Sequence, residues 1–306
     1  MRGVSTILTG LAALACAGGA MAQDVGGPPP PAVPQTAPAA PAAVSEWRTV
    51  PAGNLLVIDT NRGQILVELA PEVAPLHVDR IRLLARRGFY DGLAWHRVID
   101  WFMAQTGDPL GNGEGQSPYP DLTAEFTFRR DSQTPFTSVA APSGALVGFL
   151  HSLPVQTQPD AAMALTGDGK VHGWGLYCPG VAGMARDEGN DTANSQFFLM
   201  RQAYPALDKR YSVWGMVVSG LEVVRALKVG DGDNGMVTGS PDHMTRVRVA
   251  VDLPPDERPT VRILDTGSGT FRAMADRIRA TRGADFSVCD ITLPVEVTTR
   301  QAAAGA

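Results

Sequence analysis

Short apolar runs separated by turn residues make up most of the chain from residue 55 to residue 253. The first two runs, Leu55–Thr60 and Gln64–Leu69, lie on either side of Asn61-Arg62-Gly63. Two such runs around a turn that contains Gly are typical of a β-hairpin. Similar runs recur along this part of the chain, so the pattern predicts many short antiparallel strands.

Helical spacing of apolar residues occurs at three places. A first helix is expected from about Pro75 to Arg87, because Pro favours the first helical turn and Gly88 follows where a glycine cap belongs. A second helix is expected from Leu221 to Leu227, and a third from Phe271 to Arg282. The first two lie among the strands, so we expect a mainly β fold, a closed antiparallel barrel capped by two helices.

The N-terminus has the pattern of an export signal. Arg2 precedes an apolar stretch from Val4 to Ala15, and Ala20-Met21-Ala22 fits a cleavage site for signal peptidase. We expect residues 1–22 to be a signal peptide and the mature protein to be exported to the periplasm of a Gram-negative bacterium. Two alternatives stay open, a membrane anchor, although the stretch is short for a spanning helix, and lipoprotein processing at Cys16.

Residues 23–45 are rich in Pro and Ala, with four consecutive prolines at Pro28–Pro31. This composition favours extended polyproline conformations and cannot pack a core. We interpret the segment as a tether. The alternative, a ligand for a proline-reading domain, has no supporting sequence context.

Composition narrows the class of partner. Hydrophobic residues make up 44% of the 306 residues and charged residues 19%, so the chain can bury a sizeable core. The formal net charge is −5, and Lys and Arg form no cluster. Phosphate-backbone binding needs such a basic cluster, so we expect no nucleic acid partner.

We expect no metal ion and no cofactor. Asp231, Asp233 and Asn234 stand beside glycines as in a calcium loop, but their spacing does not match an EF-hand, and we interpret them as a solvated turn. The histidines lack the spacing of metal ligands: His77, His96, His151, His172 and His243.

Cys178 and Cys289 are the two cysteines that would remain after signal cleavage. An oxidising compartment would allow them to form a disulfide. Two buried free thiols are an equally open alternative, since the sequence does not give the distance between them.

Two ordered blocks of residues carry the informative chemistry. The first runs from Trp95-His96-Arg97 to Gly107-Asp108, and a β period of two places Arg97 and Ile99 on one face with His96 on the other. The second block begins at Met184-Ala185-Arg186 and continues at Ser195-Gln196-Phe197-Phe198. In isolation, the aromatic and Met residues of either block would be assigned to the core.

Together the blocks resemble the cyclophilin family of peptidyl-prolyl isomerases. The family pattern is Phe-His-Arg-Val-Ile, two residues, Phe-Met-x-Gln-x-Gly-Asp, and later Ser-Gln-Phe-Phe followed by a Leu-Asp loop. This chain matches the first block without a gap at Arg97, Phe102, Met103, Gln105, Gly107 and Asp108. It matches the second at Ala185, Ser195, Gln196, Phe197 and Phe198. Gly111 to Gly115 falls where the family has its Gly-rich loop.

The resemblance implies a cyclophilin-like barrel over residues 46–253 that accelerates rotation of X-Pro bonds in unfolded or extended exported proteins. It implies catalytic roles for Arg97, Phe102 and Gln105. It further implies a substrate-binding surface formed by Met103, Ala185, Arg186, Gln196, Phe198, Leu207 and Tyr211. The alternative is a non-catalytic module or holdase that binds proline peptides.

The chain departs from the family pattern at several places. Ala206 replaces an aromatic residue and Tyr211 stands where many members have His, so we expect weak cyclosporin binding. About residues 129–172 form an insertion that we expect to be an elaborated loop. Residues 254–306 form a C-terminal extension that ends in a strand-like run from Phe286 to Val297. The sequence indicates neither a function for this extension nor an oligomeric state.

Overall fold

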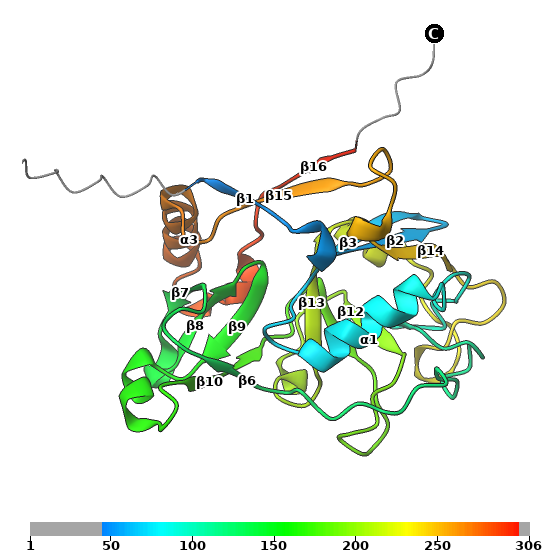
Figure 1. The fold of residues 1–306 in the computed structure, drawn as a ribbon, viewed down its shortest axis with the longest axis horizontal. Coiled ribbons are helices and arrows are strands. Elements are labelled where there is room, and N and C mark those ends of the chain that lie inside the picture. Colours follow the sequence, from blue (N-terminus) through cyan, green and yellow to red (C-terminus); the bar gives the residue numbers. More distant parts are fainter. Residues whose placement is uncertain (1–44, 300–306) are drawn as a thin grey trace, which may run out of the picture. The chain divides into compact units, whose positions relative to one another are not determined.

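The computed structural model describes residues 45–299, which form three antiparallel sheets (Figure 1). The predicted signal peptide and residues 23–44 of the predicted tether lie outside this part of the chain. Within residues 45–299, no helix has the length and apolar character required to cross a bilayer.

The central sheet has eight strands, each antiparallel to its neighbours. In spatial order they are β14 (Met244–Val249), β2 (Leu55–Thr60), β3 (Gly63–Leu69), β13 (Val213–Ser219), β11 (Val181–Met184), β12 (Phe197–Met200), β5 (Met103–Thr106) and β4 (Arg97–Val98). The strands β2 and β3 form the predicted hairpin.

The two predicted helices among the strands are α1 (Pro75–Arg86), which packs against β13 and β14, and α2 (Leu221–Ala226), which packs against β3. The sheet is open, because its ladder of paired strands ends at β14 and β4. The bridge from Ala94 to His243 and a few backbone hydrogen bonds link the residues before β4 to the start of β14 without forming a strand pair. The predicted closed barrel with a cap of two helices is therefore not confirmed.

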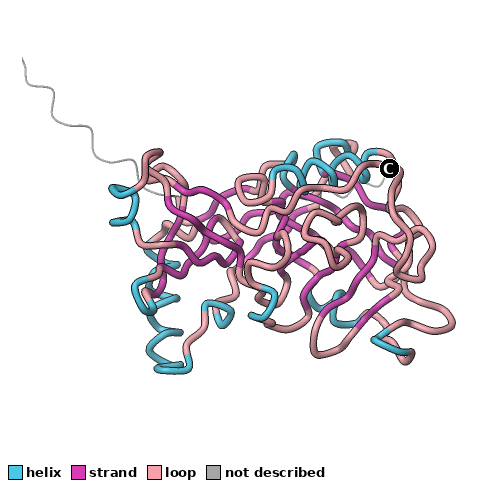
Figure 2. Tube along the Cα trace, turned by 90° about the horizontal axis from the view of Figure 1, so that it is seen from below, coloured by secondary structure: helices cyan, strands magenta, loops and turns pink. Residues whose placement is uncertain are grey.

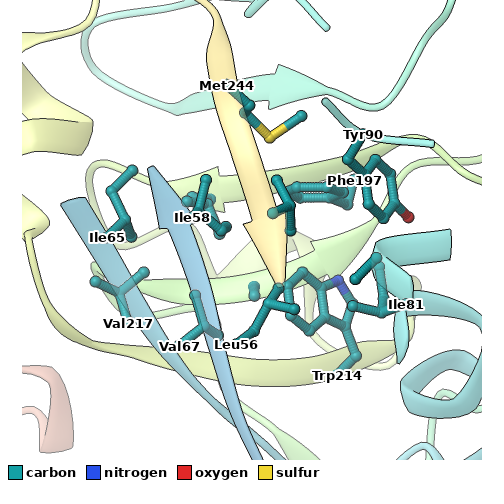
Figure 3. Packing of buried hydrophobic residues seen from close by; sticks show 14 of the residues in the cluster. Leu56, Ile58, Ile65, Val67, Ile81, Tyr90, Phe197, Trp214, Val217 and Met244 are labelled. Carbon is teal, nitrogen blue, oxygen red and sulfur yellow. The ribbon is translucent and has the colours of Figure 1, made fainter. Parts of the chain in front are cut away.

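Both faces of the β2–β3 hairpin are buried over Leu55–Ile58 and Ile65–Val67, which explains why these two stretches are continuously apolar. Leu56 and Ile58 point into the core inside the curled sheet, where the rings of Phe197 and Trp214 pack edge to face at 5.3 Å (Figure 3). The alternate residues, such as Leu55, point to the opposite face and pack there against the C-terminal extension. The hairpin therefore needs the extension to complete its burial.

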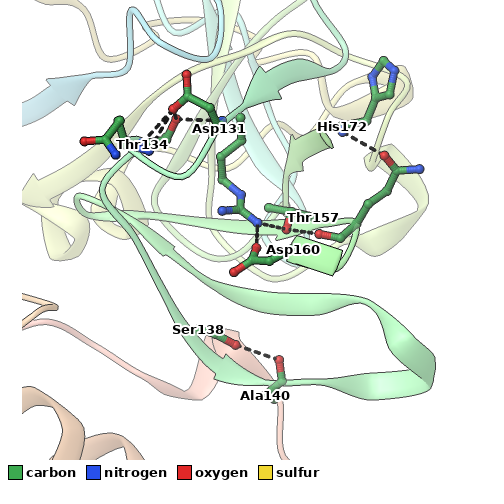
Figure 4. Close-up of polar contacts among 10 residues, drawn as sticks. Asp131, Thr134, Ser138, Ala140, Thr157, Asp160 and His172 are labelled. Carbon is green, nitrogen blue, oxygen red and sulfur yellow. Dashed lines mark hydrogen bonds and ion pairs between the residues drawn. The ribbon is translucent and has the colours of Figure 1, made fainter. Parts of the chain in front are cut away.

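The insertion forms a second sheet of its own. Its five strands, in spatial order, are β6 (Phe128–Arg130), β10 (Val171–Gly175), β9 (Leu153–Thr157), β8 (Leu146–Leu150) and β7 (Phe136–Ala140). The prediction of an elaborated loop was wrong here, because the short apolar runs of the insertion pair with one another as antiparallel strands. Arg130, the last residue of β6, is buried. It donates to Thr157 Oγ1 at 3.1 Å and to the Asp160 carboxylate (Figure 4).

The C-terminal extension forms a third sheet with the start of the described chain. Here β15 (Thr260–Leu264) lies between β1 (Trp47–Thr49) and β16 (Val295–Thr298). The predicted third helix is α3 (Gly269–Arg282), which Ser268 caps by accepting from the Phe271 N–H. Most of the predicted strand from Phe286 to Val297 is wrong. Ser287 and Asp290 form a capping box that starts a short 3₁₀ helix there, and the strand begins only at Val295.

The remaining regular segments are short 3₁₀ helices set in the loops between strands (Figure 2). They are η1 (Ala52–Asn54), η2 (Pro142–Gly144), η3 (Asp160–Leu165), η4 (Pro205–Leu207), η5 (Asp233–Gly235), η6 (Ala250–Asp252), η7 (Gly283–Asp285) and η8 (Val288–Asp290).

A disulfide joins Cys178, in the loop after β10, to Cys289 in η8, with their Cα atoms 5.1 Å apart. The sequence leaves open a disulfide or two free thiols, and the structure contains the disulfide. It links positions 111 residues apart and ties the extension to the loop that precedes β11.

We predict that the Cys178→Ala/Cys289→Ala double variant is less stable than the wild type. A cross-link over this separation stabilises a protein by up to about 5 kcal/mol, because it reduces the entropy of the unfolded chain. Urea unfolding of the oxidised wild type and of the variant measures the difference, and the reduced wild type is the control, which should match the variant. Equal stability of oxidised wild type and variant would contradict a stabilising bridge.

Candidate active site

The candidate site is a row of side chains across three neighbouring strands. Arg97 in β4 lies opposite Gln105 in β5, and Gln105 lies opposite Phe198 in β12. Residues directly opposite one another in an antiparallel sheet point to the same face. Strand register alone therefore places the guanidinium, the amide and the aromatic ring side by side.

A chain of hydrogen bonds fixes the polar members of this row. Arg97 Nη1 donates to Gln105 Oε1 at 3.0 Å, and Gln105 Nε2 donates to Gln196 Oε1 at 2.9 Å. Gln196 Nε2 in turn donates to the carbonyl oxygens of Gly113 and Gly115 at 2.8 and 2.9 Å. The Gly-rich loop thus anchors the end of a chain that holds Gln105 in one orientation.

The other side of the Arg97 guanidinium contacts Asn234, in η5. Arg97 Nε donates to the Asn234 carbonyl oxygen at 2.8 Å, and Nη2 donates to Asn234 Oδ1 at 3.0 Å. A guanidinium has five N–H groups. Within residues 45–299, three of them have acceptors, all of them neutral amide oxygens, so two N–H groups and the full positive charge are available to a ligand.

The environment of Arg97 is partly dehydrated. The side chain is half-buried, and burial of the charged guanidinium lowers the pKa of Arg97, an effect that nearby Tyr211 opposes. Arg97 stays protonated at physiological pH, because the ordinary pKa of arginine is so high. A charge in such surroundings interacts more strongly with a ligand than one in bulk water.

An apolar surface lies beside the polar row. Met103, Phe198 and Leu207 are buried in one hydrophobic cluster, and Phe102 and Tyr211 pack against it half-buried. The ring of Phe198 packs edge to face with that of Tyr211, with centroids 5.9 Å apart. The structure therefore brings the predicted aromatic and Met residues together.

The floor of this surface depends on two residues that the sequence analysis missed. Tyr177 stacks on Phe198 with centroids 5.8 Å apart, and Gly183 lies opposite Phe198 in β11. A Cβ on Gly183 would lie 2.6 Å from Phe198 Cζ and 2.7 Å from Tyr177 Oη, so only glycine leaves room for both rings. No local sequence signal indicates this, since the requirement arises from strand pairing.

A polar recess of about 270 Å³ adjoins the row on the side of Gln105 and Gln196. Its walls include Ala185 and Arg186. The Ala185 N–H donates to the Gln196 carbonyl oxygen at 2.9 Å, and the Arg186 guanidinium lies 4.5 Å from the centroid of the Tyr211 ring. All ten predicted site residues thus lie on this row, on the apolar surface or around the recess.

Two further features considered from the sequence are His96 and the segment Asp231–Asn234. His96 is buried, and burial lowers its pKa. Residues 45–299 contain no cluster of His, Cys, Asp or Glu that could hold a metal ion. Asn234 belongs to the segment interpreted as a solvated turn, and its contact with Arg97 was missed because 137 residues separate the two along the chain.

Comparisons with known proteins agree with this geometry. The model of the cyclophilin type peptidyl-prolyl cis-trans isomerase/CLD family matches residues 55–249. A probable peptidyl-prolyl cis-trans isomerase of Brucella suis biovar 1 is 34% identical over 211 residues, which are 65% of this chain and 84% of that protein. The peptidyl-prolyl cis-trans isomerase ppi1 of Schizosaccharomyces pombe is 31% identical over 170 residues, 56% of this chain and 82% of that protein.

A solved structure is similar over a larger part of the chain. The crystal structure of cyclophilin AquaCyp293 from Hirschia baltica superimposes with a TM-score of 0.76 at 33% identity and covers 84% of this chain and 95% of that one. This coverage exceeds the span of the family model. The sequence blocks, the fold and the relatives agree, and the chain belongs to the cyclophilin-type peptidyl-prolyl cis-trans isomerases.

Proposed function

We propose that Arg97 is the catalytic residue of this isomerase and that its clients are unfolded or extended X-Pro segments of exported proteins. The observation that carries the proposal is the guanidinium of Arg97, held beside an apolar surface by neutral partners. Two of its N–H groups have no acceptor among the described residues. The signal-peptide pattern of residues 1–22 supports export and action in the periplasm.

The reaction requires no bond to be made or broken. Rotation about the X-Pro amide has a barrier of about 18–20 kcal/mol, because the planar ground state is stabilised by resonance between the nitrogen lone pair and the carbonyl. Twisting the amide returns the lone pair to the nitrogen, which then becomes a hydrogen-bond acceptor. An N–H donor beside that nitrogen therefore stabilises the transition state more than the ground state.

Arg97 is suited to this task because its hydrogen-bond partners within residues 45–299 carry no negative charge. A carboxylate partner would compete with the prolyl nitrogen for the guanidinium. The partners Gln105 and Asn234 instead orient the group and leave its charge unneutralised. The apolar surface of Phe102, Met103 and Phe198 would receive the pyrrolidine ring and displace water from this contact.

The remaining site residues would bind the peptide around the proline. Gln105 has one side-chain N–H beyond the one donated to Gln196, and this group would donate to a substrate carbonyl. Leu207 and Tyr211 would border the ring, and the recess beside Ala185 and Arg186 would accept the residue before the proline. These roles, like the binding of the pyrrolidine ring by Phe102, are proposed from position and chemistry.

Arg97 and Gln105 lie in the polar row, and Phe102 lies on the apolar surface beside it. Because all three residues are present together, we favour catalysis over a binding-only module or holdase.

We predict that Arg97→Ala lowers kcat/KM at least about tenfold, because it removes an interaction that strengthens in the transition state. A protease-coupled assay of a proline tetrapeptide measures the change. Arg272→Ala, at an exposed arginine of α3, is the matched control and should keep wild-type turnover. Near-normal turnover of Arg97→Ala would remove Arg97 from the mechanism.

Phe102→Ala should mainly raise KM in the same assay, because it removes part of the surface that binds the pyrrolidine ring.

We predict weak inhibition by cyclosporin. Ala206 is exposed in η4, next to the buried Leu207, where the family usually has an aromatic residue that contacts the drug. An Ala side chain offers little contact area and no ring N–H donor. Inhibition titrations of wild type and Ala206→Trp test this, with greater sensitivity expected in the variant. Tight inhibition of the wild type would contradict the prediction.

We predict that Asp208→Asn stabilises the protein at pH 7.5 more than at pH 4. Burial raises the pKa of Asp208 from 3.8 to about 6, so the folded state binds this proton more tightly than the unfolded state does. The contribution of this carboxyl to stability therefore falls as pH rises from about 4 to 6. Asn keeps an oxygen that can accept from the Tyr177 N–H, which Asp208 Oδ1 accepts at 3.0 Å. Thermal unfolding of wild type and variant at the two pH values measures the difference in unfolding temperature. An equal difference at both pH values would contradict the raised pKa of Asp208.

A further inference from the structure

The loop around Asn234 is an ordered element attached to β4. The Gly230 N–H donates to the Val98 carbonyl oxygen at 2.9 Å, and the Val237 N–H donates to the His96 carbonyl oxygen at 2.8 Å. These two bonds attach the loop to the residues on both sides of Arg97. The loop therefore moves together with the strand that carries the guanidinium.

Internal contacts also hold the loop in one conformation. The Asp231 carboxylate accepts from the N–H and the hydroxyl of Thr238 at 3.0 and 2.7 Å, and the Gly232 N–H donates to the Met236 carbonyl oxygen at 2.9 Å. A Cβ on Gly235 would collide with Ile99. Glycine at this position thus lets the loop approach β4 closely.

Asn234 itself adopts a left-handed conformation, with φ of 54° and ψ of 26°. Asparagine tolerates this region better than most residues that carry a Cβ. In this conformation both its carbonyl oxygen and its side-chain Oδ1 accept from Arg97, through different nitrogens. Such a two-point contact fixes the plane of the guanidinium as well as its position.

We propose that Asn234 is a positioning residue for catalysis, which aims the two unused N–H groups of Arg97 at the prolyl nitrogen. Gln105 holds Nη1, and Asn234 holds Nε and Nη2. The proposal rests on the catalytic role of Arg97. It assigns a function to a loop that the sequence indicates only as a turn.

The variant Asn234→Gly tests the proposal without straining the loop. Glycine adopts the left-handed conformation freely and keeps the backbone carbonyl, so of the two acceptors that Asn234 offers Arg97 the variant removes only the side-chain Oδ1. We expect kcat to fall about three- to tenfold, as the loss of one hydrogen bond of ordinary net strength at an exposed position implies, with KM within about twofold of wild type and an unchanged unfolding midpoint. The control is Asp233→Asn, an exposed neighbour whose backbone carbonyl accepts from Met236, and it should keep wild-type kcat.

The double variant Arg97→Ala/Asn234→Gly separates positioning from an independent effect. If Asn234 acts through Arg97, the double variant has the same kcat/KM as Arg97→Ala alone. Wild-type kcat in Asn234→Gly, or a further loss in the double variant, would overturn the proposal. Normal turnover of Arg97→Ala alone would instead overturn the role of Arg97, so the two failures are distinguishable.

Discussion

The proposed mechanism depends on keeping the Arg97 guanidinium oriented while its charge remains unneutralised. A half-buried cation needs hydrogen-bond partners, yet a carboxylate partner would reduce its effect on a substrate. The chain meets both demands with amide oxygens from Gln105 and Asn234. The register of β4, β5 and β12 places Arg97, Gln105 and Phe198 in one row, and the bonds from Gln196 to the Gly-rich loop fix the amides.

The segments outside the central sheet complete its burial. The outer face of the β2–β3 hairpin packs against Val261 and Ile263 of β15, so the C-terminal extension covers surface that would otherwise be exposed to water. The insertion also contacts the extension, since Phe149 and Phe271 pack edge to face with centroids 5.6 Å apart. The bridge between Cys178 and Cys289 joins the extension to the residue next to Tyr177, beneath Phe198. These contacts give the added segments a structural role behind the site.

The sequence predicted those features that local pattern determines. The hairpin and the three helices follow from spacing and turn chemistry. The ten candidate site residues, which the resemblance to the family implies, lie together in the structure. Features that arise from pairing of distant segments were not predictable in this way. Gly183 is needed because Phe198 lies opposite it, and Asn234 contacts Arg97 although the two are 137 positions apart in the sequence. The insertion was misinterpreted because its short runs find strand partners only within its own sheet.

The most direct measurement is a crystal structure of the protein with a tetrapeptide that contains Ala-Pro. The proposed mechanism predicts the pyrrolidine ring against Phe102, Met103 and Phe198, with the Arg97 guanidinium facing the prolyl nitrogen, which becomes a hydrogen-bond acceptor when the amide twists. The hydrogen bonds from Arg97 to Asn234 should be unchanged in that complex. A proline ring bound elsewhere, or a guanidinium turned away from the prolyl nitrogen, would contradict the proposed role of Arg97.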